Sequence, residues 1–299
     1  MSRPQKTWVV EASETLGALL GRSGALTALA AGRVFVDGRR CQSALEALAV
    51  GARVELYEGR DTPAPIRILA RERGLVFAEK PVGIATEPDR RGSEHALVSH
   101  VAKELGAPLA SVSALSRLDV GVSGVVVLGL DAEARQRVVA ARERGALSRR
   151  YVALAVGVPA APSGVWNEAI AREGSGSRRR VGPGGEPAET HYAVTGVCAG
   201  HATLALAPRT GRTHQLRVHA SFHGAALLGD ATYGARKTLV LANGEVLALE
   251  RIFLHAAWVA VGDAEPVRSA LPAEFESIWD RLGGEPSAWQ RALEQPVGD

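Results

Sequence analysis

Short apolar runs separated by turns dominate the sequence beyond residue 73, and few stretches there have helical periodicity. The runs that predict strands are residues 75–78, 125–130, 151–158, 191–197, 202–206 and 253–261. A helix is expected from residue 132 to about residue 144, with Asp131 as its N-cap. This order fits an α+β domain with a large mixed, mostly antiparallel sheet better than a regular succession of βαβ units.

The chain has 299 residues, more than one average domain, so a main domain with a smaller appendage is expected. Residues 60–65 read R-D-T-P-A-P, and prolines this close together disfavour helix and leave the chain extended. We therefore predict a small module at residues 1–59, a linker at 60–73 and the main domain at 74–299.

The small module is expected to hold two helices followed by a hairpin. Leu16, Leu19 and Leu20 share one helical face, and residues 26–30 begin a second apolar stripe. A short strand at 33–36, the turn D-G and a strand at 52–56 complete the unit. The pattern G-R-V-F-V-D-G, followed by L-x-x-G-A-R-V-E-L, resembles an RNA-binding module first described in a small-subunit ribosomal protein.

That resemblance implies a small α/β RNA-binding module that contacts the RNA backbone through basic side chains. The candidate phosphate contacts are Arg22, Arg33, Arg39 and Arg40. A generic small α+β appendage is the alternative interpretation.

Charge supports an RNA partner locally rather than globally. The net charge is only +3, with a pI of about 9.1, yet arginines gather at residues 142–150 and again at 172–180. Basic clusters carry most of the non-specific affinity of proteins for nucleic acids. The glycine- and arginine-rich loop at 172–186 is therefore a candidate substrate contact, although solvated surfaces account for the same arginines.

Targeting and redox features favour a cytoplasmic protein. No apolar run approaches the ~20 residues that cross a bilayer, and the N-terminal residues lack the apolar core of a signal peptide. Cys41 and Cys198 are the only cysteines, too few for a disulfide framework or a thiolate zinc site. Membrane contact is not expected.

Four local patterns of the main domain contain polar residues in a fixed order. They are S-R-L-D-V-G-V-S-G at 116–124, R-R-Y-V-A-L at 149–154, G-R-T-H-Q-L-R-V-H at 211–219, and G-D-A-T-Y-G at 229–234 with a later L-H-A. None alone proves a chemistry, because an Arg-Leu-Asp triplet occurs by chance and a buried Arg–Asp pair is often structural. Their order and spacing resemble the RluA family of pseudouridine synthases, over roughly residues 74 to 262.

The resemblance implies a pseudouridine synthase fold and three catalytic residues. Asp119 matches the family's catalytic aspartate, and Tyr151 matches a tyrosine that stacks on the target base. Arg217 matches the arginine that pairs with the catalytic carboxylate. Lys80 belongs to the family's first strand-turn block.

Further polar residues in these blocks are expected to bind the substrate. They are Lys80, Arg117, Arg149, Arg212 and His214. Arg117 is expected to hold a phosphate or to fill the space left by a flipped base, and its alternative role is structural, at a sheet edge. His214 and His219 are expected to order the pocket by hydrogen bonds. Their spacing and the lack of a nearby cysteine or carboxylate predict no metal site.

Three positions depart from the family pattern. Ser116 stands where the family has histidine, Val122 replaces a threonine, and Arg149 replaces a lysine. Such changes affect orientation, rate or substrate choice, whereas an inactive relative would more often have lost Asp119 itself.

The residue types suit an isomerisation that consumes nothing. The sequence has no Walker loop and no G-x-G-x-x-G after a strand, so we predict no cofactor. A carboxylate is required either as a nucleophile or as the base that starts deprotonation of the sugar, and the sequence leaves both routes open. Burial beside a base would favour the neutral carboxyl group unless Arg217 supplied the opposite charge.

We therefore expect an enzyme that flips a uridine out of structured RNA and isomerises it to pseudouridine. Ribosomal RNA ranks first as the substrate and transfer RNA second, and no motif specifies the nucleotide or the oligomeric state. One alternative is a non-catalytic RNA-binding or ribosome-assembly protein. A nucleosidase is another, but it would need a second acid or a metal beside Asp119. The sister family that acts on small-subunit RNA lacks the H-Q-L-R-V-H block.

Overall fold

The structure is a computed structural model that describes residues 4–23, 25–30, 33–41, 43–57, 66–88, 96–174 and 176–297. The proline-containing part of the expected linker, residues 60–65, lies outside these ranges. Arg67–Glu72, also placed in the linker, instead forms strand β7 of the large sheet, because it pairs antiparallel with the apolar strand β8 (Leu75–Lys80).

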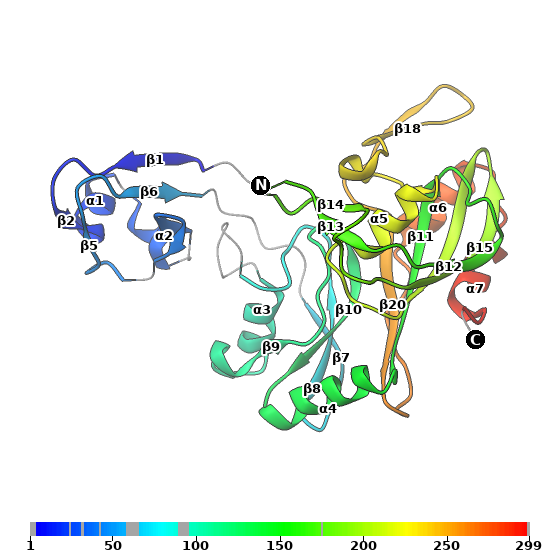
Figure 1. The fold of residues 1–299 in the computed structure, drawn as a ribbon, viewed down its shortest axis with the longest axis horizontal. Helices are drawn as coiled ribbons and strands as arrows, with labels where there is room; N and C mark the ends of the chain where they lie inside the picture. The colour runs from blue at the N-terminus through cyan, green and yellow to red at the C-terminus, as the bar shows by residue number, and fades with distance from the viewer. Residues whose placement is uncertain are drawn as a thin grey trace.

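The N-terminal residues form a small unit with its own core (Figure 1). Its sheet has the order β1 (Lys6–Val9), β6 (Arg53–Leu56), β3 (Val34–Val36) and β4 (Arg39–Arg40). The helices are α1 (Leu16–Arg22) and α2 (Leu26–Ala30), and β2 (Glu14–Thr15) pairs with β5 (Ala47–Leu48). The two expected helices and the hairpin are present, and β1 and the β2–β5 pair are additions to them.

Among the described residues, the main domain contains an 11-stranded sheet. Its principal order is β12 (Ser163–Trp166), β15 (Thr190–Cys198), β16 (His201–Pro208), β11 (Leu147–Val156), β20 (Leu254–Val261), β10 (Ser123–Gly129), β8 and β7. Three short strands pair with inner strands of this order: β9 (Ser113–Ala114) with β10, β17 (Ala226–Leu227) with β11, and β21 (Val267–Arg268) with β20. Within the described ranges only β10 and β20 run parallel, which confirms a mixed, mostly antiparallel sheet.

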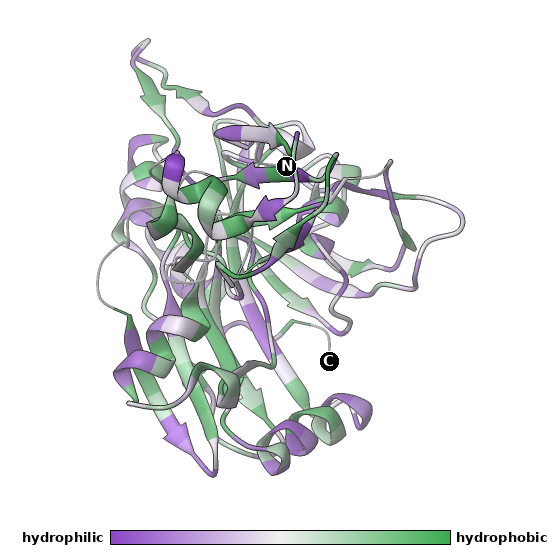
Figure 2. Cartoon of the chain, turned by 90° about the vertical axis from the view of Figure 1, so that its left-hand side faces the viewer, coloured by the Kyte–Doolittle hydropathy of each residue, from purple (hydrophilic) through white to green (hydrophobic). Residues whose placement is uncertain are grey.

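Helices cover both faces of this sheet (Figures 1 and 2). Side chains alternate along β11, so that Tyr151 and Ala153 belong to one core and Val152 and Leu154 to another. The first core includes α3 (Leu97–Glu104) and α5 (Gln215–Phe222). The opposite face is covered by α6 (Ala273–Arg281) and α7 (Ser287–Glu294), with α4 (Ala132–Glu143) over β8 and β10.

The expected strands and the helix α4 are confirmed within a few residues at their ends. Asp131 is the N-cap of α4, where its carboxylate accepts a hydrogen bond of 2.7 Å from the Ala134 amide. The loop expected at 172–186 differs, because β14 (Arg179–Val181) folds back on β13 (Ile170–Arg172) as a hairpin.

Smaller elements complete the chain. A second hairpin joins β18 (Thr238–Val240) to β19 (Val246–Ala248), and short 3₁₀ helices lie at η1 (Leu109–Ser111) and η2 (Ala231–Tyr233). Among the described residues, none of the helices is long and apolar enough to cross a membrane.

Glycine is required where the two parallel strands meet. Gly124 is the second residue of β10 and has a φ of 118°, and a Cβ there would lie 2.2 Å from the carbonyl oxygen of Ala256 on β20. A larger residue would push the strands apart. The S-G pair that ends the first sequence block therefore fixes the sheet beside Asp119.

Candidate active site

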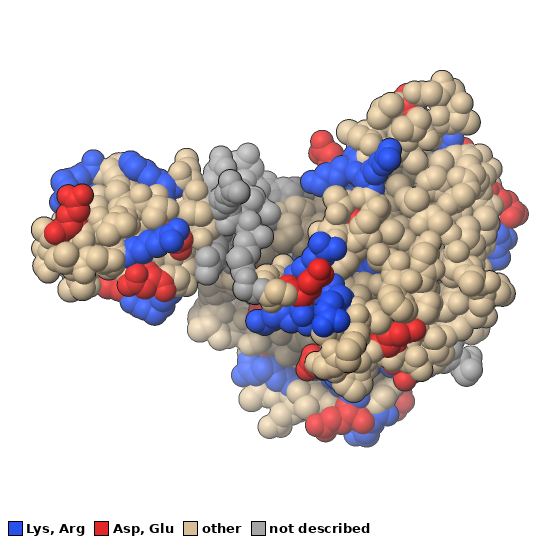
Figure 3. Space-filling model, turned by 45° about the horizontal axis from the view of Figure 1, so that its top comes forward, with Lys and Arg blue, Asp and Glu red and all other residues tan. Residues whose placement is uncertain are grey.

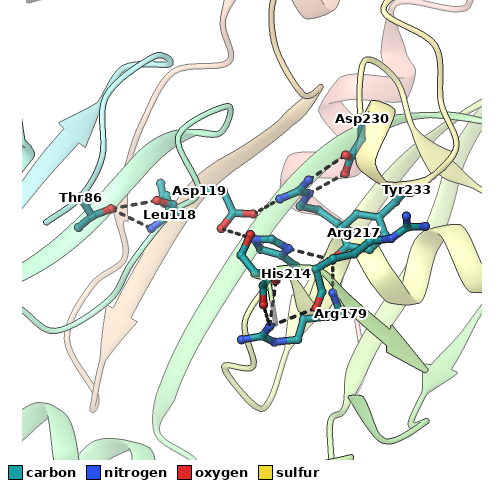
Figure 4. Close-up of polar contacts among 11 residues, drawn as sticks. Thr86, Leu118, Asp119, Arg179, His214, Arg217, Asp230 and Tyr233 are labelled. Carbon is teal, nitrogen blue, oxygen red and sulfur yellow. Dashed lines mark hydrogen bonds and ion pairs between the residues drawn. The ribbon is translucent and has the colours of Figure 1, made fainter. Parts of the chain in front are cut away.

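Asp119 lies in the segment between β9 and β10, which is attached to the loop after β8. The Thr86 hydroxyl accepts from the Leu118 amide at 3.1 Å and donates to the Leu118 carbonyl at 3.0 Å. On the other side of Asp119, the carbonyl of Val120 accepts a hydrogen bond of 2.8 Å from the Gly83 amide. The main chain on both sides of Asp119 is thus held by one neighbouring loop, and Figure 4 shows the contact of Thr86 with Leu118.

Arg217 projects from α5 and joins two carboxylates. Its Nη1 donates to Asp119 Oδ2 at 2.6 Å, while Nε and Nη2 donate to Asp230 at 2.6 and 2.8 Å. Burial alone would lower the pKa of Arg217, but the hydrogen bonds and negative charges of both aspartates raise it above its usual value. The guanidinium is therefore a permanent positive charge beside Asp119.

Tyr151 faces the same side of the sheet as α5 and is buried. Desolvation raises the pKa of its hydroxyl, an effect opposed by the charge of Arg149 and reinforced by that of Asp119. Arg149 itself donates from Nη2 to the carbonyls of Pro208 and Thr210, at 3.0 and 2.9 Å. It therefore fastens the loop that leads into α5.

His214 is the N-cap residue of α5 and adopts a left-handed backbone, with φ 59°. Its Nε2 lies 3.8 Å from Asp119 Oδ1, and its Nδ1 lies 2.8 Å from the Tyr233 hydroxyl. Burial lowers the pKa of His214, although the charge of Asp119 opposes this. Asp119, His214 and Arg217 thus form one polar group on the face that Tyr151 shares (Figure 4).

Gln215 organises the start of α5 from a buried position. Its side-chain oxygen accepts from the Thr210 hydroxyl at 2.7 Å and from the Arg212 amide at 3.0 Å. Its amide group donates to the Glu189 carbonyl at 2.8 Å. His219, one turn on, bonds to Thr190 and to a main-chain oxygen, so it is an ordered hydrogen-bonding histidine as expected.

The remaining expected substrate-binding residues occupy different environments. Arg117 is exposed and lies 3.5 Å from Glu87, and Arg212 donates to the Pro187 carbonyl at 2.9 Å while remaining partly exposed. Lys80 is fully buried, and its ammonium group donates to the carbonyls of Pro81 and Ile84 at 2.9 and 3.0 Å. A lysine in that position supports the loop next to Asp119 from inside the protein.

The positions that depart from the family pattern are integrated into the fold. The Ser116 hydroxyl accepts from the Val127 amide at 2.9 Å, and Val122 is buried in the core below the site. The next residue, Ser123, bonds to Nδ1 of the buried His255 at 2.8 Å. The main-chain amide of Val122 donates to the Asp119 carbonyl at 3.0 Å, a contact that does not depend on the side chain at position 122.

The four arginines expected to bind RNA lie on several elements of the small unit. Arg22 pairs with Glu14 at 2.6 Å and Arg39 pairs with Glu46, so both carry an acidic neighbour. Arg33 donates to the Tyr57 carbonyl at 3.5 Å, and the guanidinium of Arg40 lies over the Phe35 ring at 5.3 Å. On the face drawn in Figure 3, basic side chains form separate groups with acidic ones between them.

The sequence interpretation gave no site role to three residues that complete this site. Asp230 and Tyr233 lie in the G-D-A-T-Y-G block, and Tyr233 was interpreted as structural. The order of that block after G-R-T-H-Q-L-R-V-H was the signal that could have identified both. Thr86 had no signal, because its partner Leu118 is 32 positions away. Within the described residues, no group of three or more histidines, cysteines or carboxylates could hold a metal ion.

Comparison with known proteins agrees with this architecture. Residues 74–222 match the family model described as RNA pseudouridylate synthase. The chain is 34% identical over 178 residues to an uncharacterized RNA pseudouridine synthase, YhcT, of Bacillus subtilis, covering 58% of this chain and 59% of that one. It is 31% identical over 215 residues to ribosomal large subunit pseudouridine synthase D of Escherichia coli K12, covering 68% and 65%.

A solved structure has the same fold. Human RNA pseudouridylate synthase domain containing 4 superimposes with a TM-score of 0.59 at 26% identity, over 73% of this chain and 93% of that one. An α+β pseudouridine synthase fold therefore carries the aspartate–arginine pair described above. The chain belongs to the RluA-type family of RNA pseudouridine synthases. The matched region spans less than two thirds of the length of these curated relatives.

Proposed function

We propose that the protein isomerises uridine to pseudouridine in structured RNA, with Asp119 as the catalytic carboxylate. The observation that carries this proposal is that the two carboxylate oxygens of Asp119 have different surroundings. Its Oδ2 is bound by Arg217 at 2.6 Å, whereas its Oδ1 has His214 at 3.8 Å, beyond hydrogen-bond distance. The side chain is 29% exposed, so a substrate can reach the oxygen that Arg217 does not hold.

In the reaction the bond between ribose C1′ and uracil N1 breaks and a bond from C1′ to C5 forms. The C5 proton is lost and N1 gains one, so nothing is oxidised or consumed. Asp119 serves either as the nucleophile at C1′ or as the base that removes a sugar proton, and both routes use its ionised form. Arg217 places a permanent positive charge 2.6 Å from that carboxylate.

Tyr151 is proposed to stack on the flipped base, since its ring lies on the face of the sheet that α5 covers and the charge of Asp119 acts on its hydroxyl. Base–aromatic stacking contributes about 1–3 kcal/mol per base, which offsets part of the cost of extruding a nucleotide from RNA. Arg117 and Arg212 are proposed as contacts to the surrounding phosphates. Lys80 and Arg149 donate to main-chain carbonyls, so we propose that they position the loop next to Asp119 and the loop before α5.

Ribosomal RNA is proposed as the substrate, with transfer RNA second, because one relative bears the name of a ribosomal large subunit enzyme. The small N-terminal unit is proposed to bind the same RNA through Arg22, Arg33, Arg39 and Arg40. A cytoplasmic location follows from that substrate. Replacing Arg22 and Arg39 with glutamine should then lower the affinity for RNA and reduce its dependence on salt.

The test is a map of pseudouridine at nucleotide resolution in total RNA from a strain that lacks the gene. One or a few sites should vanish, return with the wild-type gene and stay absent with Asp119→Asn. Asp280→Asn is the matched control, because Asp280 is an exposed carboxylate on α6, and it should restore the sites. A map that never changes would favour the RNA-binding alternative, and release of free uracil would favour a nucleosidase.

A further inference from the structure

The Tyr233 hydroxyl has two polar neighbours. The main-chain amide of Arg179, on strand β14, donates to it at 2.9 Å. Nδ1 of His214 lies 2.8 Å from the same oxygen. Tyr233 is buried, and its ring also packs against Arg217, whose guanidinium carbon is 4.9 Å from the ring centroid. Figure 4 shows this side chain between the hairpin and the histidine.

These contacts define where the hydroxyl proton goes. The amide of Arg179 can only donate, so it occupies an acceptor position of the Tyr233 oxygen. The phenol has one proton of its own, and Nδ1 is the partner within 2.8 Å that can accept it. If Nδ1 carried a proton instead, two donors would point at this oxygen and the phenol proton would lose that partner in a buried site.

The other ring nitrogen gives an independent reason for the same arrangement. Nε2 faces Asp119 Oδ1 at 3.8 Å. An ionised carboxylate only accepts hydrogen bonds, so an N–H directed toward it is favourable and a lone pair is not. Both ends of the imidazole therefore select the proton on Nε2.

We propose that Tyr233 is a positioning residue that holds His214 as the Nε2–H tautomer. His214 then presents a hydrogen-bond donor beside the acceptor Oδ1 of Asp119. At 3.8 Å the two groups do not bond to each other, so each remains available to the flipped nucleotide. The inference rests on the proposed function, because it assigns this donor–acceptor pair to a nucleotide.

The charged groups around His214 are compatible with a neutral imidazole. Asp119 and Asp230 contribute negative charge, and Arg217 and Arg179 contribute positive charge. Burial is the largest influence, and it lowers the pKa of His214. The left-handed N-cap backbone aims the ring, while the hairpin amide orders the Tyr233 oxygen.

Nitrogen NMR on the full-length protein tests the tautomer without any substrate. The chain has 8 histidines, so a His214→Gln spectrum identifies the His214 signals. We expect the Nε2–H pattern in the wild type and also in Asp119→Asn, where Tyr233 alone fixes the ring. Adding Tyr233→Phe to Asp119→Asn should give a mixture of tautomers. An Nδ1–H pattern in the wild type, or mixing in Asp119→Asn alone, would overturn the proposal.

Kinetics on an RNA substrate test the consequence. Tyr233→Phe should lower kcat by roughly 10-fold or more, because a misplaced group beside the reacting atoms slows the reaction, and should change KM less than twofold. In a His214→Gln background it should add less than a twofold loss. Tyr192→Phe is the matched control, because Tyr192 is a buried tyrosine of β15 whose hydroxyl donates to the Ala161 carbonyl at 3.3 Å. Equal losses from Tyr233→Phe in both backgrounds would overturn the coupling.

The two proposals fail in different ways. If the wild type forms no pseudouridine, the proposed function fails and the spectra still decide the role of Tyr233. If the wild type is active but Tyr233→Phe leaves both the spectra and kcat unchanged, only the positioning role is lost.

Discussion

Arg217 holds Asp119 and Asp230 at opposite ends of one guanidinium group. Nη1 contacts Asp119 at 2.6 Å, and Nε with Nη2 forms a two-point contact with Asp230. The two carboxylates differ in depth, because the Asp230 side chain is 1% exposed and that of Asp119 is 29% exposed. Asp230 therefore fixes the arginine, and the arginine in turn fixes Asp119.

This arrangement predicts that one asparagine substitution mainly lowers stability and the other mainly lowers turnover. Asp230→Asn breaks a buried ion pair by removing one partner, which should lower the free energy of unfolding by about 3–5 kcal/mol. Asp119→Asn should cost about 1 kcal/mol or less, because its carboxylate is partly solvated, yet it should abolish turnover. Urea unfolding and a pseudouridine assay on both variants provide the comparison. Similar stability losses would contradict the division of roles.

Arg217→Lys should reduce turnover by about 100-fold or more. Lysine keeps the positive charge but presents it at one point, so it cannot span two carboxylates as a planar guanidinium does. Arg217→Ala should be inactive. The control is Arg281→Lys, at the surface pair of Arg281 with Glu245, which should leave turnover unchanged. Near-normal activity of Arg217→Lys would show that charge alone suffices.

The sequence was sufficient to predict six strands of the main-domain sheet and the pairing of Asp119 with Arg217. Asp119, Tyr151 and Arg217 come from three separate blocks, and the expected contact between Arg217 and Asp119 is present. Apolar strands have a clear local pattern, so their positions follow from the sequence. The blocks were ordered along the chain, and the sheet brings them together on one face.

The supporting contacts could not be predicted in the same way. Thr86 and Leu118 meet only because β8 and β10 are neighbours in the sheet. The sequence does not tell whether Lys80 faces RNA or the protein interior. Only the fold shows that it is buried. The hairpin of β13 and β14 was missed because glycine and serine predominate between its strands.

Thr86→Val should loosen the segment that carries Asp119. Valine has nearly the same shape, but it leaves the Leu118 amide and carbonyl without the hydroxyl that serves both. An unsatisfied buried polar group costs about 1–3 kcal/mol, and turnover should fall with stability. Thr86→Ser keeps the hydroxyl and is the matched control. If valine and serine behaved alike in unfolding and turnover, the hydroxyl would not be what holds Leu118.

His255 links the stability of the sheet to pH. It is 1% exposed on β20, and its Nδ1 lies 2.8 Å from the Ser123 hydroxyl, to which Arg251 also donates. Burial and the charge of Arg251 lower the pKa of His255 to about 3. The imidazole is therefore neutral in the folded protein at neutral pH.

Stability should fall as the pH drops from about 6.5, the usual histidine pKa, toward about 3. In that interval the unfolded chain binds a proton at His255 that the folded chain does not, so acid favours unfolding. By pH 4 this amounts to about 3 kcal/mol. His255→Asn keeps a polar group near Ser123 and cannot titrate, so its unfolding free energy should depend less steeply on pH. Parallel pH profiles for the two proteins in urea unfolding would show that His255 is not the group responsible.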